Sequence, residues 1–275
     1  MKKNNKYSIG IFDSGFGGLE ILKEVRQVLP NYNYIFLGDN ARTPYGTRSQ
    51  ETIYKFTKQA IDFLFKKNCY LVILACNTAS SKALRKIQRQ YLKVNYPKRR
   101  VLGVLIPACQ QAISKTKNKK VGVIGTEATI SSKAFVKEII KLNPNIKIFQ
   151  KSCPLLVCIV ESGEQDLNVT NLALKNYLNP LKKSRVDTLI LGCTHYGVLK
   201  SKIRKIMGSK VKVISEGKVV GQKLKAYLNN HPEIKNRLEK KGKLVFYTTD
   251  LSKKFANLGS IFFGKKINAK KVILE

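Results

Sequence analysis

The sequence predicts an α/β protein of two related halves, each a mainly parallel β-sheet flanked by helices. Short apolar, β-branched runs alternate with longer amphipathic stretches along the whole chain, which is typical of strand–helix–strand units with parallel strands. Two pairs of strand-like segments also recur in the same order, which indicates a duplicated unit. The segments 8–15 and 120–127 are 112 positions apart, and 71–80 and 188–197 are 117 positions apart.

The predicted strands are short runs of isoleucine, valine, leucine and phenylalanine. In chain order they cover 8–12, 33–37, 70–75, 101–105, 120–124, 145–149, 187–191 and 210–214. The longer segments between them have the amphipathic pattern of helices. These predicted helices cover 18–29, 49–67, 79–93, 108–116, 131–142, 166–182, 197–207 and 217–229. Ligands of such sheets gather at the carboxyl ends of the strands.

The duplicated segments place a cysteine at the same point in each half. "LVILACNTAS" carries Cys76 and "TLILGCTHYG" carries Cys193, each at the end of an apolar run. Two halves facing each other about a pseudo-twofold axis would form a cleft with one cysteine on each wall. "SIGIFDSG" ends a third strand and would add Asp13 and Ser14 to the same rim.

Length and composition are those of a globular protein with one large or two medium domains, at 275 residues and 43% hydrophobic content. No stretch reaches the roughly 18 uninterrupted apolar residues of a membrane helix, so we expect no membrane partner. The N-terminal "MKKNNKYSIGIFDSG" lacks the apolar core of a signal peptide, and we expect a cytoplasmic location. Six cysteines without CxxC spacing and only two histidines argue against a metal site and for free thiols.

The net charge of +35, from 52 basic and 17 acidic residues, has two interpretations. A dense basic face would bind nucleic acid by neutralising phosphates. The alternative is compositional drift, because lysine, asparagine, isoleucine, phenylalanine and tyrosine are all abundant and the lysines are spread along the chain. No nucleic-acid-binding motif is present, so we favour drift and expect no specific nucleic-acid partner.

The glycine-rich segment "FDSGFGG" (12–18) is not a dinucleotide-binding or P-loop motif, because Glu20 stands where the third glycine of G-x-G-x-x-G is needed. Two interpretations remain open. The glycines can simply allow a tight strand-to-helix turn. Alternatively, Asp13, Ser14 and the amides of the helix start can hold a small anion or amine.

Cys76 and Cys193 are the candidate reactive thiols, because a helix N-terminus after each strand would depress the pKa of the thiol. The other four cysteines lack this setting and are assigned to packing or indifferent surface positions. His195 lies two residues after Cys193 and is a candidate acid/base group. Thiols on opposite walls suit the inversion of a stereocentre, since one removes the α-proton and the other returns a proton to the opposite face.

Several segments, in order along nearly the whole chain, resemble the cofactor-independent glutamate racemases. They are "GIFDSGFGGLEIL" (10–22), "GDNARTPYG" (38–46), "ACNTAS" (75–80), "VGVIGTEATISS" (121–132), "LGCTHY" (191–196) and "FYTTDLSKKF" (246–255). The resemblance implies two α/β domains with the active site in the interdomain cleft. One domain would cover 1–104 plus 214–275 and the other 105–213, because the C-terminal segment of this family returns to the first domain.

The resemblance also implies the reaction and the site residues. Cys76 and Cys193 would be the catalytic bases, with Asp13 and His195 supporting the thiols on their respective sides. The implied glutamate-contacting residues are Asp13, Ser14, Pro44, Tyr45, Gly46, Asn77, Thr78, Thr126, Glu161, Thr194 and His195. No cofactor is implied, the product D-glutamate would supply peptidoglycan synthesis, and a homodimer is one expected assembly.

Three positions depart from the usual family pattern. Gly197 stands where proline is usual, Ile106 where many members carry an acidic residue, and Glu216 near a usual aspartate-containing turn. Aspartate racemisation is the closest alternative activity, and the "FDSG" and "PYG" motifs favour glutamate. A nucleic-acid-binding module that uses the positive charge is the alternative from another class.

Overall fold

Two parallel β-sheets form the framework of the computed structural model, which describes residues 7–275 apart from the side chains of 253–256. The larger sheet has six strands in the order β10-β9-β2-β1-β3-β4, and the smaller has four in the order β6-β5-β7-β8. The strands are β1 (Ser8–Asp13), β2 (Tyr34–Gly38), β3 (Cys69–Leu74), β4 (Arg100–Gly103), β5 (Lys120–Gly125), β6 (Lys147–Ser152), β7 (Thr188–Gly192), β8 (Lys212–Ile214), β9 (Leu244–Thr248) and β10 (Ala269–Lys271). All the strand pairings within the two sheets are parallel, which confirms the predicted fold class.

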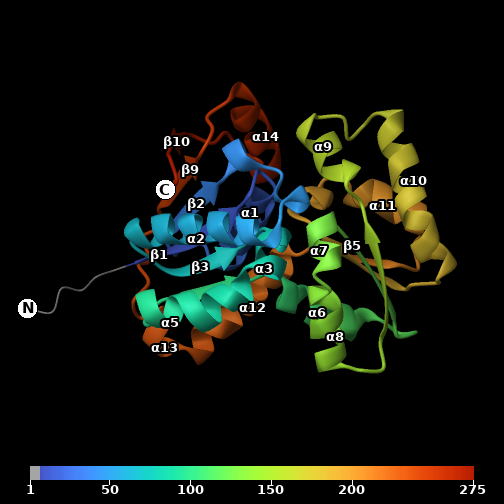
Figure 1. The fold of residues 1–275 in the computed structure, drawn as a ribbon, viewed down its shortest axis with the longest axis horizontal. Coiled ribbons are helices and arrows are strands. Elements are labelled where there is room, and N and C mark those ends of the chain that lie inside the picture. The colour runs from blue at the N-terminus through green and yellow to red at the C-terminus, as the bar shows by residue number, and fades with distance from the viewer. Residues whose placement is uncertain (1–6) are drawn as a thin grey trace, which may run out of the picture.

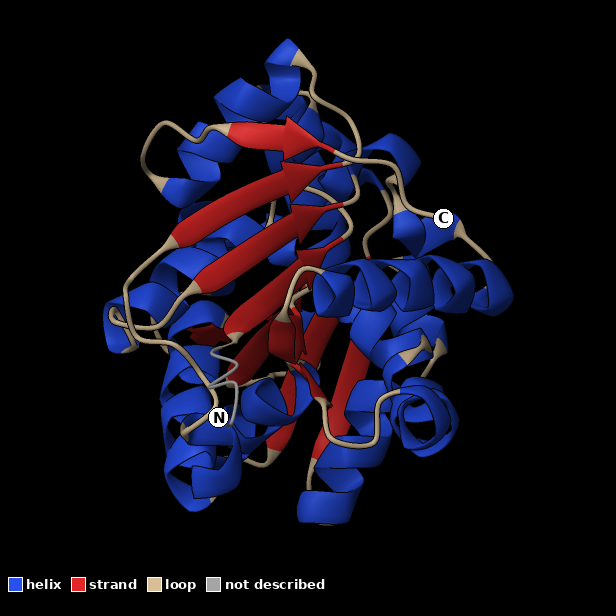
Figure 2. Ribbon diagram, turned by 90° about the vertical axis from the view of Figure 1, so that its left-hand side faces the viewer, coloured by secondary structure: helices blue, strands red, loops and turns tan. Residues whose placement is uncertain are grey.

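Helices cover both faces of each sheet (Figures 1 and 2). They are α1 (Gly18–Val28), α2 (Gln50–Lys66), α3 (Asn77–Lys82), α4 (Leu84–Lys86), α5 (Leu92–Asn95), α6 (Leu105–Lys115), α7 (Glu127–Ser131), α8 (Ala134–Leu142), α9 (Leu155–Glu161), α10 (Asn168–Lys183), α11 (Lys200–Met207), α12 (Gly217–Asn230), α13 (Pro232–Lys235) and α14 (Lys253–Phe263). Strands β2, β3 and β7 are buried along their whole length, as expected of parallel strands that are covered on both faces.

Alternating side chains of β1 show how the larger sheet is packed. Ile9 and Ile11 belong to a core cluster that also contains the apolar stripes of α1 and α12. Phe12 points to the opposite face and joins a cluster with α2 and the segment from α3 to α5. The first cluster continues into the second half through β7, α9, α10 and α11, so the two halves share one apolar core around α1.

The C-terminal part of the chain returns to the first sheet, where β9 pairs with β2 and β10 pairs with β9 (Figure 1). All eight predicted strands are present, but β10 at the sheet edge and β9 beside it were not predicted as strands. Both are only partly buried. Helices α9, α13 and α14 were also not predicted.

Three predicted helices differ from the structure. The segment 79–93 is divided into α3, α4 and a π-helical turn, Ile87–Tyr91, before α5 begins. The segment 131–142 is broken at Lys133, whose φ of 53° is left-handed and separates α7 from α8. The predicted start of a helix at 197 is wrong, because Thr194–Gly197 forms a 3-10 turn and α11 begins only at Lys200.

In the part of the chain that the structure describes, no helix is long and apolar enough to cross a membrane.

Candidate functional site

The carboxyl ends of central strands from both sheets meet at a small cavity. β3 leads to Cys76, β5 to Thr126 and β7 to Cys193, and all three residues line a space of about 20 Å3. The cavity is lined by Ser14, Thr43, Pro44, Tyr45, Gly46, Cys76, Asn77, Thr78, Thr126, Val157, Cys193, Thr194 and His195. The structure therefore brings most of the predicted site residues together, and two of them are the paired cysteines.

Cys76 is the N-cap residue of α3. Its Sγ lies 3.5 Å from the backbone nitrogen of Ala79 and 3.3 Å from Oγ of Ser14. Burial nevertheless raises the pKa of the thiol to about 11, with a further increase from the nearby Asp13 carboxylate, although the hydrogen bonds from Ser14 and Ala79 act in the opposite direction. The expected depression of the pKa by the helix start is therefore wrong for the protein without substrate, since desolvation is the larger effect.

Cys193 is buried at the entrance of the 3-10 turn, without a regular helix after it. Its Sγ lies 3.9 Å from Nδ1 of His195. Burial raises the pKa of this thiol well above its ordinary value, and the neighbouring Cys76 and Asp13 contribute in the same direction, whereas the backbone hydrogen bond from His195 lowers it. The expected pKa depression is wrong here too, because burial favours the uncharged form of both thiols.

Asp13 connects the two halves. Its carboxylate accepts a hydrogen bond of 3.0 Å from the backbone nitrogen of Gly15 and one of 3.3 Å from Oγ1 of Thr194. Burial raises the pKa of Asp13, and the nearby His195 lowers it. The acid therefore lies behind the cavity, where it holds the Thr194 turn of the opposite half.

His195 is held by a carboxylate from α9. Its Nε2 lies 3.0 Å from Oε1 of Glu161, and the same oxygen is 3.5 Å from Oγ1 of Thr43. The histidine is buried, so the position of its ring is set by contacts on both nitrogens. Glu161, a predicted site residue, therefore contacts the site through His195. The pairing of these two side chains could not be predicted from the sequence.

Hydroxyl groups gather on the wall formed by α3 and α7. Oγ1 of Thr78 lies 2.9 Å from Oγ1 of Thr126 and 3.2 Å from Oγ1 of Thr129. Nδ2 of Asn77 donates a hydrogen bond of 2.7 Å to Oε2 of Glu216. Thr129 and Glu216 were not predicted as site residues, and the only sequence signal was the departure from the family pattern at Glu216.

The loop with Pro44 closes the cavity from the first half. Pro44 follows a cis peptide bond and precedes the 3-10 turn Tyr45–Thr47. The Tyr45 hydroxyl donates a short hydrogen bond to the Asp39 carboxylate, so this ring is fixed at the base of the loop. A Cβ on Gly46 would lie 2.7 Å from Cβ of Thr126, which shows how closely the loop approaches the opposite half.

Gly197 has a clear packing role. A Cβ at this position would lie 1.7 Å from Oε2 of Glu20, a half-buried side chain of α1. Glu20 therefore occupies the space that a proline ring would need. Glycine at position 197, where the family usually has proline, leaves room for the Glu20 carboxylate.

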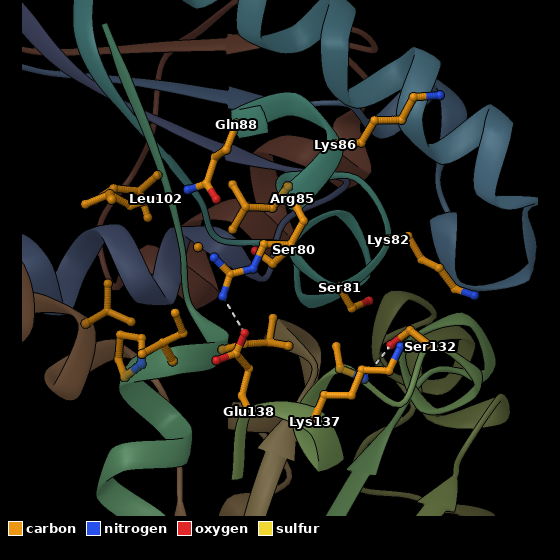
Figure 3. Close-up of a pocket in the computed structure, with 18 of the residues that line it drawn as sticks. Ser80, Ser81, Lys82, Arg85, Lys86, Gln88, Leu102, Ser132, Lys137 and Glu138 are labelled. Atoms are coloured by element: carbon orange, nitrogen blue, oxygen red, sulfur yellow. Dashed lines mark hydrogen bonds and ion pairs between the residues drawn. The ribbon is translucent and has the colours of Figure 1, made fainter. Parts of the chain in front are cut away.

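A much larger groove of about 730 Å3 lies between α3, α4, α6, α8 and α12, and neither candidate thiol lines it (Figure 3). Lys82, Lys86 and Lys137 lie along its sides, and an ion pair between Arg85 and Glu138 joins the two halves (Figure 3). Ile106, the third departure from the family pattern, lines the same groove. The residues suited to proton transfer are at the small cavity and not here.

The remaining four cysteines do not line the small cavity that contains Cys76 and Cys193. Cys69, Cys109 and Cys153 are buried, whereas Cys158 is exposed. Among the described residues, no group of histidine, cysteine, aspartate or glutamate side chains is arranged to hold a metal ion.

The fold and the site define an α/β protein of two related halves, with one thiol from each half on a single buried cavity. Sequence comparison gives the particular family. The model of the Asp/Glu/hydantoin racemases matches residues 19–222, and the glutamate racemase of Geobacter metallireducens is 38% identical over 94% of this chain and 94% of its own. The chain belongs to this racemase family, within its glutamate racemases, and is therefore an isomerase.

Solved structures agree with this assignment. The glutamate racemase isoform RacE1 of Bacillus anthracis has a TM-score of 0.89 at 34% identity, with 98% of each chain covered. The glutamate racemase of Francisella tularensis, solved in complex with D-glutamate, has a TM-score of 0.88 at 35% identity, with 99% of each chain covered. The resemblance that the sequence motifs indicated is confirmed over nearly the whole chain.

Proposed function

We propose that this protein interconverts L- and D-glutamate by a two-base mechanism in which Cys76 and Cys193 exchange the α-proton. The observation that carries the proposal is that the two thiols line one cavity from opposite halves of the molecule. The relatives named glutamate racemase and the complex of one of them with D-glutamate support the choice of substrate.

The two thiols have reciprocal roles in the proposed reaction. One thiolate takes the α-proton from one face of the bound amino acid, and the electron pair of the broken C–H bond stays on the substrate as a carbanion. The thiol on the other face then gives its proton to the same carbon and becomes the thiolate. One C–H bond breaks, one forms, and the reverse reaction starts from the other cysteine.

The raised pKa of both thiols determines what substrate binding must contribute. A thiolate in a buried site needs a neighbouring positive charge. The α-ammonium group of the substrate provides that charge next to the thiol. The proton that leaves the thiol passes to Asp13 on the side of Cys76, or to His195, held by Glu161, on the side of Cys193. Ionisation of the thiol is therefore coupled to binding.

The contacting groups are those that the resemblance implied. We propose that the hydroxyls and amides after each thiol bind the two carboxylates and the ammonium group of glutamate, and stabilise the negative charge that develops during proton removal. The proposed contact residues are Ser14, Pro44, Tyr45, Gly46, Asn77, Thr78, Thr126, Thr194 and His195. Asp13 and Glu161 complete the proposed site through their hydrogen bonds to Thr194 and His195.

The cavity must open for substrate to enter. A volume of about 20 Å3 is close to the space needed by one water molecule, so it does not hold an amino acid. We therefore propose that the domain 1–104 plus 214–275 moves relative to the domain 105–213. Closure around the substrate then excludes water and strengthens the electrostatic contacts.

The biological role follows from the product. We propose that the protein supplies D-glutamate for peptidoglycan synthesis in the cytoplasm, without a cofactor and with a homodimer as one possible assembly. Binding of specific nucleic acid has no part in this role.

Circular dichroism of the purified protein with L- or D-glutamate in D₂O tests the proposal. We expect loss of optical activity together with incorporation of deuterium at the α-carbon, and full activity after treatment with a chelator. Aspartate in place of glutamate tests the closest alternative, and a higher rate with aspartate would reassign the substrate.

Single substitutions test the two-base mechanism. Cys76→Ser and Cys193→Ser should each lower racemisation by at least about a thousandfold, because a serine hydroxyl is a far weaker acid and base than a thiol. Cys158→Ser is the matched control, since this cysteine is exposed and lies outside the cavity. A near-normal rate in either active-site variant would exclude the mechanism.

A further inference from the structure

Glu216 lies between the two cysteine loops without a role in the proton transfer described above. It immediately precedes α12, and one residue separates it from the end of β8. Only 4% of Glu216 is exposed. With Cys193 and Thr194 it lines a second small cavity of about 10 Å3. Its hydrogen bond to Asn77 links the segment after β8 of the smaller sheet to the start of α3, which follows β3 of the larger sheet.

The polar groups of this pair are only half satisfied. Nδ2 of Asn77 donates to Oε2 of Glu216, but Oε1 of Glu216 and Oδ1 of Asn77 are buried without a hydrogen-bond partner. A buried polar atom left unpaired costs about 1–3 kcal/mol, so a carboxyl group retained only for stability would normally have both oxygens satisfied. The free Oδ1 belongs to a residue that lines the cavity between the thiols.

The surroundings of Glu216 favour its uncharged form. Burial raises the pKa of Glu216 well above its ordinary value, and the nearby acids Asp13 and Glu20 act in the same direction, while the hydrogen bond from Asn77 acts against them. A neutral carboxyl group still has a carbonyl oxygen that accepts the Asn77 hydrogen bond. Glutamine has the same shape and can make the same bond.

We propose that Glu216 is a positioning residue, which fixes the Asn77 side-chain amide so that Oδ1 is presented to the α-ammonium group of the substrate. This inference rests on the proposed racemase function. An amide that is free to rotate would also present its NH₂ group, which repels an ammonium group. By accepting from Nδ2, Glu216 selects the orientation that attracts the substrate.

Kinetics of Glu216→Leu and Glu216→Gln, with glutamate in both directions, test the inference. Leucine has a similar size but cannot accept, so we expect KM to rise at least about tenfold, with a smaller change in kcat because a contact made in both ground and transition states acts on binding. Glutamine should restore KM to within about threefold of the wild type, because it keeps the acceptor.

A second readout separates positioning from a merely structural role. Glu216→Leu leaves Nδ2 of Asn77 buried without its acceptor, so we expect Tm to fall by about 2–4 °C. At a temperature well below Tm, where the variant is folded, a merely structural role would leave KM unchanged, whereas positioning raises KM. In an Asn77→Ala background, Glu216→Leu should change KM by less than about twofold. The reason is that Asn77→Ala has already removed the hydrogen bond through which Glu216 acts.

Glu24→Leu is the control. Glu24 packs against Gly217, the residue after Glu216, and its substitution should leave KM unchanged. The inference is wrong if Glu216→Leu has the KM of the wild type, or if Glu216→Gln is as impaired as Glu216→Leu. An inactive wild-type protein would instead overturn the proposed function itself.

Discussion

At the scale of single residues, Cys76 experiences two opposing effects. Its position at the start of α3 favours the thiolate, whereas burial disfavours any charge there. The result is a pKa of about 11, so burial is the larger effect in the substrate-free protein. Burial therefore disfavours the reactive thiolate in the substrate-free protein.

Alkylation of Cys76 by iodoacetamide tests this balance. Because the pKa is about 11, only about one molecule in ten thousand carries the thiolate at pH 7, and the fraction rises as the pH approaches 11. The alkylation rate, followed by mass spectrometry of the Cys76 peptide, should therefore rise about tenfold per pH unit between pH 7 and 9.5. Exposed Cys158 serves as the internal control for active reagent. A plateau below pH 8 would contradict the raised pKa.

At the scale of secondary-structure elements, the closed site depends on the approach of α1 to the 3-10 turn after β7. Gly17 has ordinary right-handed helical angles, so it is required by the contact and not by its backbone conformation. A Cβ there would lie 2.5–2.7 Å from the side chain and backbone of Thr194. The neighbouring contact, between Gly197 and Glu20, involves only the end of a flexible side chain.

Gly17→Ala and Gly197→Ala form a matched pair for this contact. Gly17→Ala should lower kcat/KM about a hundredfold, because Thr194 and its backbone would have to move away from the opposite half. Gly197→Ala should lower it less than about threefold, because the Glu20 carboxylate can turn aside. Equal effects in the two variants would show that backbone approach does not control the site. Tm of each variant shows whether the fold is retained.

At the scale of the whole molecule, the charge of +35 is the unusual property. It contrasts with the small site, where the buried acids Asp13 and Glu216 lie close to the thiols. The excess positive charge therefore belongs mainly to the outside of the molecule. A positive exterior attracts any polyanion, and also an anionic substrate, by long-range electrostatics.

Binding to duplex DNA is expected to be non-specific and weak at physiological salt. The affinity, measured by fluorescence anisotropy, should fall about a hundredfold or more between 50 and 200 mM salt, because counterion release drives such binding. Racemisation in the same buffers should change much less, since the site is closed. Tight, sequence-dependent binding that persists at 200 mM salt would contradict the interpretation of the charge as compositional.

The local pattern was sufficient for the α/β class, for all eight predicted strands and for the pairing of Cys76 with Cys193. Each of these features depends on short-range regularities: apolar runs for buried strands, amphipathic spacing for helices, and a repeat that places equivalent residues alike. The prediction missed β9, β10, α9, α13 and α14. Of these, β10 and α13 have only three and four residues, too few for a clear periodic pattern.

Only the tertiary structure decided the chemical state of the site. The pKa of each thiol depends on how completely the two halves exclude water, and residues far apart in sequence provide that exclusion. The bond between Asn77 and Glu216, the carboxylate of Glu161 on His195, and the packing of Glu20 against Gly197 are all contacts between distant segments. A sequence determines which groups are available, whereas desolvation and contact depend on the folded arrangement.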